Sequence, residues 1–358
     1  MPSHRTETPS RWRRMGKTLG INLIVFLVLL IVVELVLGSW LFGPEFGSLN
    51  VGINANRVET ESPYYPAGTA LIYQRDEYGL RGDHGDPSAI TILAVGGSTT
   101  NDRVATEGDT WPDVLEEELR ARGYDHVVAN AGVDGHSSMG HIKSFELWFP
   151  NIPDLAPEYA LIYVGHNDRG VAPGQVPQPD SLTSPSWSRR LSTYIRNHSV
   201  FSRAFKNLKG WIAAHDIDVV YGDVDTNPET ISYQPVAPVT PNQEALDAYG
   251  ERLRLLDQVA RNYGTTPIYV TQPVGLVREA GGELEEVAGS GAGSIFQEMR
   301  AYNDVLLAFC RDVGAICIDL AGELVFDTQD FYDAIHTTPS GSRRIGTYLA
   351  EQLPAHIE

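Results

Sequence analysis

Positive charge, cysteine and internal repeats are scarce or missing in this chain of 358 residues. It carries 27 Lys and Arg against 46 Asp and Glu, a formal net charge of −19, and most of the cations are arginine. Because binding to nucleic acid needs a basic face, this balance argues against a nucleic-acid partner. A strongly acidic surface keeps a protein soluble and says little about its fold. No internal repeat is present, so the chain is not a repeat array.

Cysteine is limited to two residues, Cys310 and Cys317. The surrounding sequence predicts a helix that ends near the first and a buried strand that holds the second, so we expect two structural thiols. An oxidising compartment would permit a disulfide between them, and that alternative stays open.

Long apolar runs are missing too, with one exception near the N-terminus. From Leu19 to Phe42, Glu34 is the one charged residue. Roughly 24 residues at about 1.5 Å each extend over about 36 Å, enough to cross a hydrocarbon core of about 30 Å. A cleavable signal peptide has an apolar region of only about 7–15 residues and a small-residue cleavage site, which residues 36–38 (VLG) match poorly. We therefore expect an uncleaved transmembrane anchor over residues 19–42.

The residues before this run predict its orientation. Lys and Arg beside a membrane-spanning helix favour the cytoplasmic side of the membrane. Residues 1–18 are therefore predicted to be a cytoplasmic tail, and the residues after the anchor are predicted to lie outside. Residues 1–42 hold five Lys or Arg and two Asp or Glu, which leaves 22 cations and 44 anions on the exported part. Glu34, near the outer end, can reach toward water. The basic residues are Arg5, Arg11, Arg13, Arg14 and Lys17.

Strands and helices alternate in two stretches of the remaining sequence. Short apolar runs bounded by turn residues predict buried parallel strands at 89–95, 125–130, 159–164, 267–271 and 315–318. Amphipathic spacing predicts helices at 110–122, 136–149, 243–262, 294–312 and 340–352. The alternation predicts a doubly wound α/β domain over 89–358, interrupted by a Pro-rich insertion at 171–242. Residues 43–88, without a sustained period, are predicted to be a connector laid over the domain.

Residues 95–100 (VGGSTT) place a serine directly after the first predicted strand. Ligands bind at the carboxyl edge of an open α/β sheet, where this strand ends. Gly96 and Gly97 allow a tight turn that leaves the Ser98 hydroxyl exposed. The pattern differs from the G-x-S-x-G elbow of α/β-hydrolases, because Thr100 stands where the second glycine belongs.

A base and oxyanion donors are available elsewhere in the sequence. Asp333 and His336 are three residues apart, so one turn can present the imidazole and hold its tautomer. His336 would accept the hydroxyl proton of Ser98, while Asp333 would stabilise the charged imidazole. The backbone N–H groups of Gly135 and Ser98 and the side-chain amide of Asn167 are candidate oxyanion donors. This chemistry needs neither a metal nor a cofactor.

Together, four segments resemble the motif blocks of the SGNH, or GDSL-type, hydrolases. They are residues 96–100 (GGSTT), 130–138, 165–168 (GHND) and 333–336 (DAIH). The resemblance implies a flavodoxin-like three-layer α/β/α sandwich and hydrolysis, or sometimes transfer, of acyl groups on sugars or lipids. It implies that Ser98, Asp333 and His336 are catalytic and that Ser98, Gly135 and Asn167 form the oxyanion hole. His166 fills a position that is often glycine in the family, which would narrow the pocket beside Asn167.

Other polar residues near these segments are expected to be structural: Arg81, His136, His141 and Asp168. The insertion is expected to be a capping subdomain that buries aromatic residues. A substrate lid, or a surface facing an anionic glycan or lipid head groups, is the alternative. The residues behind this alternative are Trp187, Tyr194, Phe201, Phe205 and Trp211, interleaved with Arg189, Arg190, Arg196, Arg203, Lys206 and Lys209.

The sequence therefore predicts a membrane-anchored serine ester hydrolase outside the cytoplasm, by family analogy at a bacterial plasma membrane. We expect it to remove O-acyl groups, such as acetyl, from a carbohydrate or lipid. An O-acyltransferase acting on an envelope polysaccharide is one alternative. A non-catalytic glycan-binding or assembly protein is another, although a pure binder has no need for the Ser-Gly-Asn-His set. Acyl chain length, the alcohol and the oligomeric state stay open.

Overall fold

A computed structural model describes most of the chain. The described residues are 11–38, 49, 51–59, 62–172, 175, 199–201 and 230–357. The chain divides into two compact units, Met1–Ser48 with Pro185–Asp218 and Leu49–Ser184 with Val219–Glu358. Each unit is described by itself.

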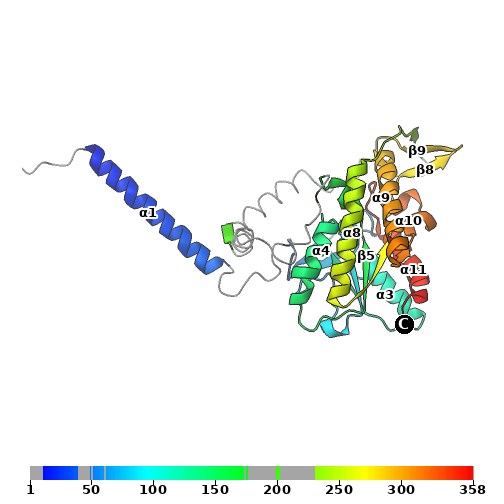
Figure 1. The fold of residues 1–358 in the computed structure, drawn as a ribbon, viewed down its shortest axis with the longest axis horizontal. Coiled ribbons are helices and arrows are strands. Elements are labelled where there is room, and N and C mark those ends of the chain that lie inside the picture. The colour runs from blue at the N-terminus through cyan, green and yellow to red at the C-terminus, as the bar shows by residue number, and fades with distance from the viewer. Residues whose placement is uncertain are drawn as a thin grey trace, which may run out of the picture. The chain divides into compact units, whose positions relative to one another are not determined.

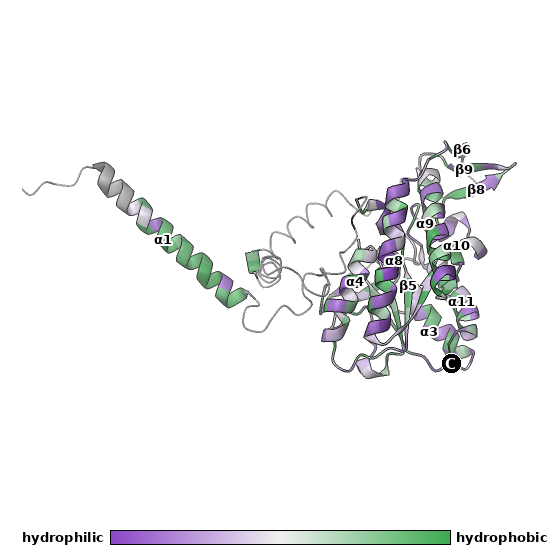
Figure 2. Cartoon of the chain, viewed as in Figure 1, coloured by the Kyte–Doolittle hydropathy of each residue, from purple (hydrophilic) through white to green (hydrophobic). Residues whose placement is uncertain are grey.

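The first unit contains one long helix, α1 (Arg11–Leu37). Its stretch Thr18–Leu37 has a mean hydropathy of 2.9 and no buried residues, so by length and composition it could cross a membrane. In Figure 2 most of this stretch has the green colour of hydrophobic residues. The helix ends at Leu37, and residues 39–42 of the predicted anchor lie outside the described residues. The carboxylate of Glu34 accepts a hydrogen bond from the backbone N–H of Val200 at 2.8 Å.

The second unit is built on a five-stranded parallel sheet (Figure 1). The order β4-β3-β5-β7-β10 is the 2-1-3-4-5 order of flavodoxin-like folds, which confirms the predicted fold class. All five predicted strands are present. Their bounds are β3 (Ile92–Gly96), β4 (Val128–Gly132), β5 (Tyr159–Tyr163), β7 (Thr266–Val270) and β10 (Ile316–Ile318).

The first strand begins later than predicted. Residues 89–91 were expected to belong to it, but Asp86 accepts a hydrogen bond from the backbone N–H of Ser88 and caps the 3₁₀ turn η1 (Pro87–Ala89). Proline at the first position of that turn fixes a φ angle that suits it. The chain becomes extended only after this turn.

Helices cover both faces of the sheet. On one face α3 (Trp111–Ala121) packs against α11 (Pro339–Gln352). On the other, α4 (Ser138–Leu147) packs against α8 (Gln243–Tyr263), which also contacts α9 (Ala292–Val313). Figure 1 shows the resulting three layers. Thr110 caps α3 in a capping box with Asp113, and Gly264 ends α8 in the left-handed conformation.

The core between the sheet and the α3–α11 pair is formed by alternate strand positions. Ile92 and Ala94 of β3 point into it, as do Leu161 and Tyr163 of β5 and Ile268 and Val270 of β7. Trp111 of α3, fully buried among them, donates its indole N–H to the carbonyl of Thr99 at 3.1 Å. The core is thereby joined to the residue that follows Ser98.

Two small antiparallel sheets were not predicted. In the connector, β1 (Asn56–Glu59) pairs with β2 (Leu71–Gln74). A second sheet has the order β6 (Tyr233–Pro235), β9 (Glu283–Val287), β8 (Val277–Ala280). Its β8–β9 turn consists of Gly281 and Gly282, both with positive φ, as a tight hairpin requires. These strands have only three to five residues and mix apolar with polar positions, so apolar periodicity did not predict them.

Short helical elements complete the described part of the chain. They are α2 (Ser98–Asn101), α10 (Leu320–Glu323), η2 (Phe149–Asn151), η3 (His166–Gly170), η4 (Thr328–Asp330) and η5 (Leu353–Ala355). Of the aromatic and basic residues that define the predicted patch in the insertion, only Phe201 is described, and it is exposed. The expected role of the insertion 171–242 therefore stays a prediction.

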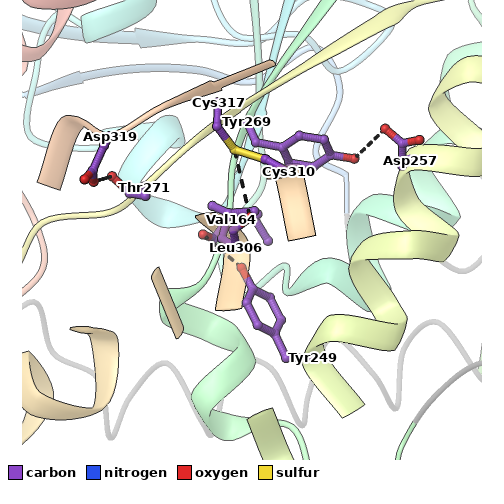
Figure 3. Close-up of a disulfide and its surroundings, with 9 residues drawn as sticks. All are labelled: Val164, Tyr249, Asp257, Tyr269, Thr271, Leu306, Cys310, Cys317 and Asp319. Atoms are coloured by element: carbon purple, nitrogen blue, oxygen red, sulfur yellow. Dashed lines mark hydrogen bonds between the residues drawn. A yellow bond between two sulfur atoms is a disulfide. The ribbon is translucent and has the colours of Figure 1, made fainter. Parts of the chain in front are cut away.

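The expectation of two free thiols was wrong, because Cys310 and Cys317 form a disulfide (Figure 3). Cys310 lies in α9 and Cys317 in the edge strand β10, with Cα atoms 6.2 Å apart. Gly314 ends α9 with a φ angle of 68°, a left-handed conformation that turns the chain back beside its own helix. Sequence patterns give no side-chain direction at such a turn.

We predict that the disulfide stabilises the second unit. Closing a loop with a sequence separation of 7 restricts the unfolded chain, and the loop-entropy relation gives about 2 kcal/mol for so short a loop. The Cys310→Ser/Cys317→Ser double variant should lose that much free energy of unfolding in urea titrations followed by tryptophan fluorescence. Reductant should destabilise the parent chain and leave the double variant unchanged. A parent chain insensitive to reductant would contradict the prediction.

Candidate active site

Ser98 lies at the carboxyl edge of the sheet, as the first residue of α2 and two residues beyond the end of β3. Gly96 and Gly97 are needed because neighbouring atoms pack closely against them, and neither has a positive φ angle. A Cβ atom on Gly97 would lie 2.4 Å from the side-chain nitrogen of Asn167, and one on Gly96 would lie 2.0 Å from the Thr100 hydroxyl. The third motif segment can therefore approach the serine only because residue 97 has no side chain.

The structure brings Ser98, His336 and Asp333 together in one hydrogen-bonded chain. The Ser98 Oγ and His336 Nε2 are 2.8 Å apart, and His336 Nδ1 lies 2.7 Å from an Asp333 carboxylate oxygen. A carboxylate only accepts, so Nδ1 carries the ring proton and Nε2 is left to accept the serine hydroxyl. The segments that meet here are 238 residues apart in the sequence.

Asp333 is held by its own turn. Its second carboxylate oxygen accepts the backbone N–H groups of Ile335 at 2.8 Å and His336 at 2.7 Å. Burial alone would raise the pKa of this carboxyl, but the hydrogen bonds and the charge of His336 outweigh burial and lower the pKa below its usual range. Asp333 is therefore ionised at neutral pH and can stabilise a charged imidazole.

An aromatic stack that the sequence analysis missed covers His336. The ring of Tyr332 lies parallel to the imidazole, with centroids 5.5 Å apart and an interplanar angle of 8°. The Tyr332 ring also contacts the ring of Tyr64 of the connector, with centroids 5.8 Å apart. The only feature of the sequence that pointed to a role for Tyr332 was its position immediately before Asp333. Tyr64 lies in an aperiodic stretch far from every motif.

Gly135 and Asn167 are brought to the same edge of the sheet as Ser98. Gly135, in the loop after β4, has a φ angle of 74°, and no atom lies within 4 Å of where its Cβ would be. Asn167, in η3, donates one amide hydrogen to the carbonyl of His136 at 3.0 Å. This bond ties the third motif segment to the second and leaves the other amide hydrogen for another acceptor.

A side-chain network fixes the far end of α2 to the loop that contains Gly135. Asn101 donates to the carboxylate of Asp134 at 2.7 Å and accepts from the guanidinium of Arg75 at 2.7 Å. Arg75, which is buried, also donates to the carbonyl of Gly132 at 2.5 Å and to that of Gly79 at 2.5 Å. Motif patterns did not predict Asn101 or Arg75, because neither belongs to a motif position.

The sequence profile of the GDSL-like lipase/acylhydrolase family matches residues 94–344. The chain belongs to this family. The resemblance seen in the four sequence segments is thereby confirmed.

Several relatives are known. Esterase TesA of Pseudomonas aeruginosa is 31% identical over 93 residues, which are 25% of this chain and 45% of that esterase, so the match spans less than half of that relative. Among solved structures, TesA is 17% identical with a TM-score of 0.42, over 75% of this chain and 99% of that one. A G-D-S-L lipolytic family member from Veillonella parvula is 14% identical with a TM-score of 0.42, over 75% and 100%. An aryl esterase of M. smegmatis is 16% identical with a TM-score of 0.41, over 75% and 100%.

Asp168 and Arg81 make the contacts of structural residues in this member of the family. Asp168 is fully buried and accepts the backbone N–H of Ser138 at 2.9 Å and two guanidinium hydrogens of Arg252 at 3.0 and 3.1 Å. Burial raises the pKa of Asp168, and Ser138 and Arg252 partly offset that rise. Arg81, 1% exposed, donates to the carbonyls of Asn101, Asp102 and Ala105. Both residues hold motif segments in place.

Three histidines, two of them buried and His136 half-buried, are neutral at neutral pH. Burial lowers the pKa of His136 to about 4 and those of His141 and His166 to about 3. His166 is held by two contacts: its backbone N–H donates to the Gln272 side chain at 2.7 Å, and its ring Nε2 meets the carbonyl of Pro273 at 2.9 Å. Within the described part of the chain, no group of three His, Cys, Asp or Glu is placed to hold a metal ion.

We predict that His166 makes the protein less stable in mild acid. In the unfolded chain it takes up a proton near pH 6.5, whereas in the folded chain it stays neutral down to about pH 3. The unfolded state therefore binds more protons below pH 6.5, and stability falls as the pH is lowered. Relative to His166→Gln, the parent chain should lose about 1 kcal/mol between pH 6.5 and 5.5 in urea titrations. A stability difference that is constant across this range would contradict the prediction, and His141→Gln should behave in parallel.

Proposed function

We propose that Ser98, His336 and Asp333 act as a catalytic triad that cleaves a carboxylic ester through an acyl-enzyme. The continuous hydrogen-bonded chain from Ser98 Oγ through both ring nitrogens to Asp333 is the observation that carries this proposal. His336 takes the hydroxyl proton as Ser98 attacks the carbonyl carbon. It then gives that proton to the departing alkoxide, and the acyl group remains on Ser98. Water, deprotonated by the same nitrogen, releases the acid and restores the serine.

The negative oxygen formed in each step needs fixed donors. We propose the backbone N–H groups of Ser98 and Gly135 and the second amide hydrogen of Asn167 for this role. The bond from Asn167 to His136 supports the assignment, since it fixes the amide next to the Gly135 loop before substrate arrives. One preorganised donor of this kind is worth about 3 kcal/mol of transition-state stabilisation.

The stack of Tyr332 on the imidazole supports a positioning role for this ring. A face-to-face contact at 5.5 Å restricts rotation of His336 about its side-chain bonds. The electron-rich face of a tyrosine also favours a cation above it, and the imidazole is cationic in mid-reaction. Tyr332 would therefore help His336 to keep the orientation that both proton transfers require.

Location outside the cytoplasm is part of the proposal. The helix stretch Thr18–Leu37 is long and apolar enough to cross a membrane, and the basic residues before it favour a cytoplasmic N-terminus. The Cys310–Cys317 disulfide agrees with this location, because disulfides persist in oxidising compartments. An anchored esterase facing outward would meet the O-acyl groups, acetyl above all, of carbohydrates or lipids at the cell envelope.

Replacing Ser98 or His336 by alanine should abolish ester hydrolysis. We expect turnover of p-nitrophenyl acetate by the detergent-purified chain to fall about 10⁴-fold or more in either variant, because triad residues act as a unit. Butyrate and octanoate esters, compared with acetate, report the acyl length that the site accepts. The exposed residues Ser88 and His356 provide matched alanine controls that should retain full activity. Unchanged turnover in Ser98→Ala, with no labelling of the parent chain by a fluorophosphonate, would refute the triad.

An acyltransferase can be distinguished in the same assay. Acceptor glycan added to the mixture would then speed release of p-nitrophenol and yield acylated glycan in place of free acid. A hydrolase should show the same rate of p-nitrophenol release with and without acceptor, with one acid formed per ester cleaved.

The proposed orientation predicts how cells carrying the full chain respond to protease. A C-terminal epitope should be digested when protease is added to intact spheroplasts, because residues after the anchor are expected outside. A cytoplasmic marker protein in the same sample should stay intact until the cells are lysed. Protection of the epitope until lysis would contradict the location, while leaving the triad untouched.

A further inference from the structure

A small cavity lies at the end of α2 opposite Ser98 and has no part in the chemistry proposed above. Its volume is about 240 Å³. One wall is the β1–β2 hairpin of the connector, and the opposite wall is formed by the ends of α2 and β4. The lining residues that carry the argument are Arg57, Glu59, Arg75, Asn101, Arg103 and Asp134.

The cavity adjoins two of the elements that hold the reacting groups. Asn101 is the last residue of the four-residue helix α2, which begins at Ser98. Asp134 immediately precedes Gly135, and its carboxylate is bonded to Asn101 at 2.7 Å. The cavity therefore lies at the carboxyl ends of β3 and β4, the edge of the sheet where ligands bind. Asn101 and Asp134 thus bring the cavity within three residues of Ser98 and one residue of Gly135 along the chain.

Three guanidinium groups line the cavity, against two carboxylates. Arg75 is buried, and its side chain holds Asn101 and neighbouring carbonyls in place. Arg57 and Arg103 have side chains that are 64% and 52% exposed. Their partners are Glu59, at 3.8 Å from Arg57, and Asp134. Exposed ion pairs are worth little, so either guanidinium can turn to a ligand at small cost.

The local balance of charge is unusual for this chain. The whole sequence has 46 acidic residues against 27 basic ones, yet this lining has an excess of one positive charge. Arginine offers a planar pair of donors that matches a carboxylate or phosphate. The five charged side chains of the lining suit a polar unit better than an acyl chain, and the volume is below the roughly 300 Å³ at which sites for drug-sized ligands begin. Its size fits a single sugar unit.

We propose that this cavity binds the alcohol part of the ester substrate, a sugar unit that carries an anionic group, carboxylate or phosphate, held by Arg57 and Arg103. This inference rests on the proposed esterase function and adds the class of substrate. The connector, through its β1–β2 hairpin, is then a specificity element of the enzyme.

Three matched esters test the proposal with the detergent-purified full chain. They are acetylated methyl galactopyranoside, the corresponding galacturonoside with a C6 carboxylate, and the corresponding 6-phosphate. Acetate release gives kcat/KM for each, and p-nitrophenyl acetate reports the triad alone. The galacturonoside or the phosphate should exceed the neutral sugar by about tenfold, as a charge-assisted hydrogen bond predicts, and the more active of the two identifies the anion. Salt should reduce this preference.

Arginine variants assign the preference to the cavity. Arg57→Gln and Arg103→Gln should each lose most of the preference for the anionic ester through a higher KM, while turnover of the neutral ester and of p-nitrophenyl acetate stays within about twofold. Arg254→Gln is the matched control, because Arg254 is 54% exposed and pairs with Asp312, outside this lining. It should retain the full preference.

Each failure has its own meaning. Equal kcat/KM for the neutral and anionic esters overturns the cavity proposal, as does an equal loss on all substrates in Arg57→Gln. The triad proposal survives either result if p-nitrophenyl acetate is still turned over in a Ser98-dependent way. If p-nitrophenyl acetate is not turned over at all, the proposed function itself is refuted, and the cavity proposal with it.

Discussion

The hydrogen bonds that hold α2 in place are the constraint on which the rest of the site depends. A helix of four residues cannot stabilise itself, since a single turn costs more conformational entropy than its one or two bonds return. Here each residue after Ser98 is held from outside. Thr99 accepts from Trp111 and Gln272, the Thr100 carbonyl accepts from Asn130 at 2.8 Å, and Asn101 is bonded on both sides. The position of the Ser98 hydroxyl relative to His336 is therefore fixed before substrate binds.

Buried charged side chains also hold the motif segments in place. They fix the geometry of these segments, but each charged group loses its contact with water. Arg81 and the Asp168–Arg252 pair have lost nearly all contact with water, and a buried pair seldom adds net stability over an apolar replacement of the same shape. These groups contribute specificity of conformation, because a guanidinium that donates to several carbonyls at once permits only one arrangement of the loops. Preorganised donors and bases are what acyl transfer requires, because they need no rearrangement as charge develops.

Sequence patterns predicted the layers of this fold and the motif residues, and they did so for physical reasons. Strands buried on both faces are continuous apolar runs, and each long helix has one apolar face, so both are visible locally. Ser98, Asn167 and His336 stand at strand ends or before a helix, where motif order suffices. Other features were invisible because they depend on which distant side chains meet. Tyr64 reaches Tyr332 from an aperiodic connector, and the Cys310–Cys317 bond depends on how one glycine turns the chain.

The connector has a consequence for anyone who wishes to shorten this enzyme. A form that begins at residue 89, where the α/β alternation starts, would look complete by pattern alone. It would lack Arg75 and Arg81, so the carbonyls of Gly132, Asn101 and Ala105 would lose their donors inside a folded protein. An unpaired buried carbonyl costs about 1–3 kcal/mol. The unit that contains the site begins at Leu49, so a shortened form should keep the connector from that residue onward.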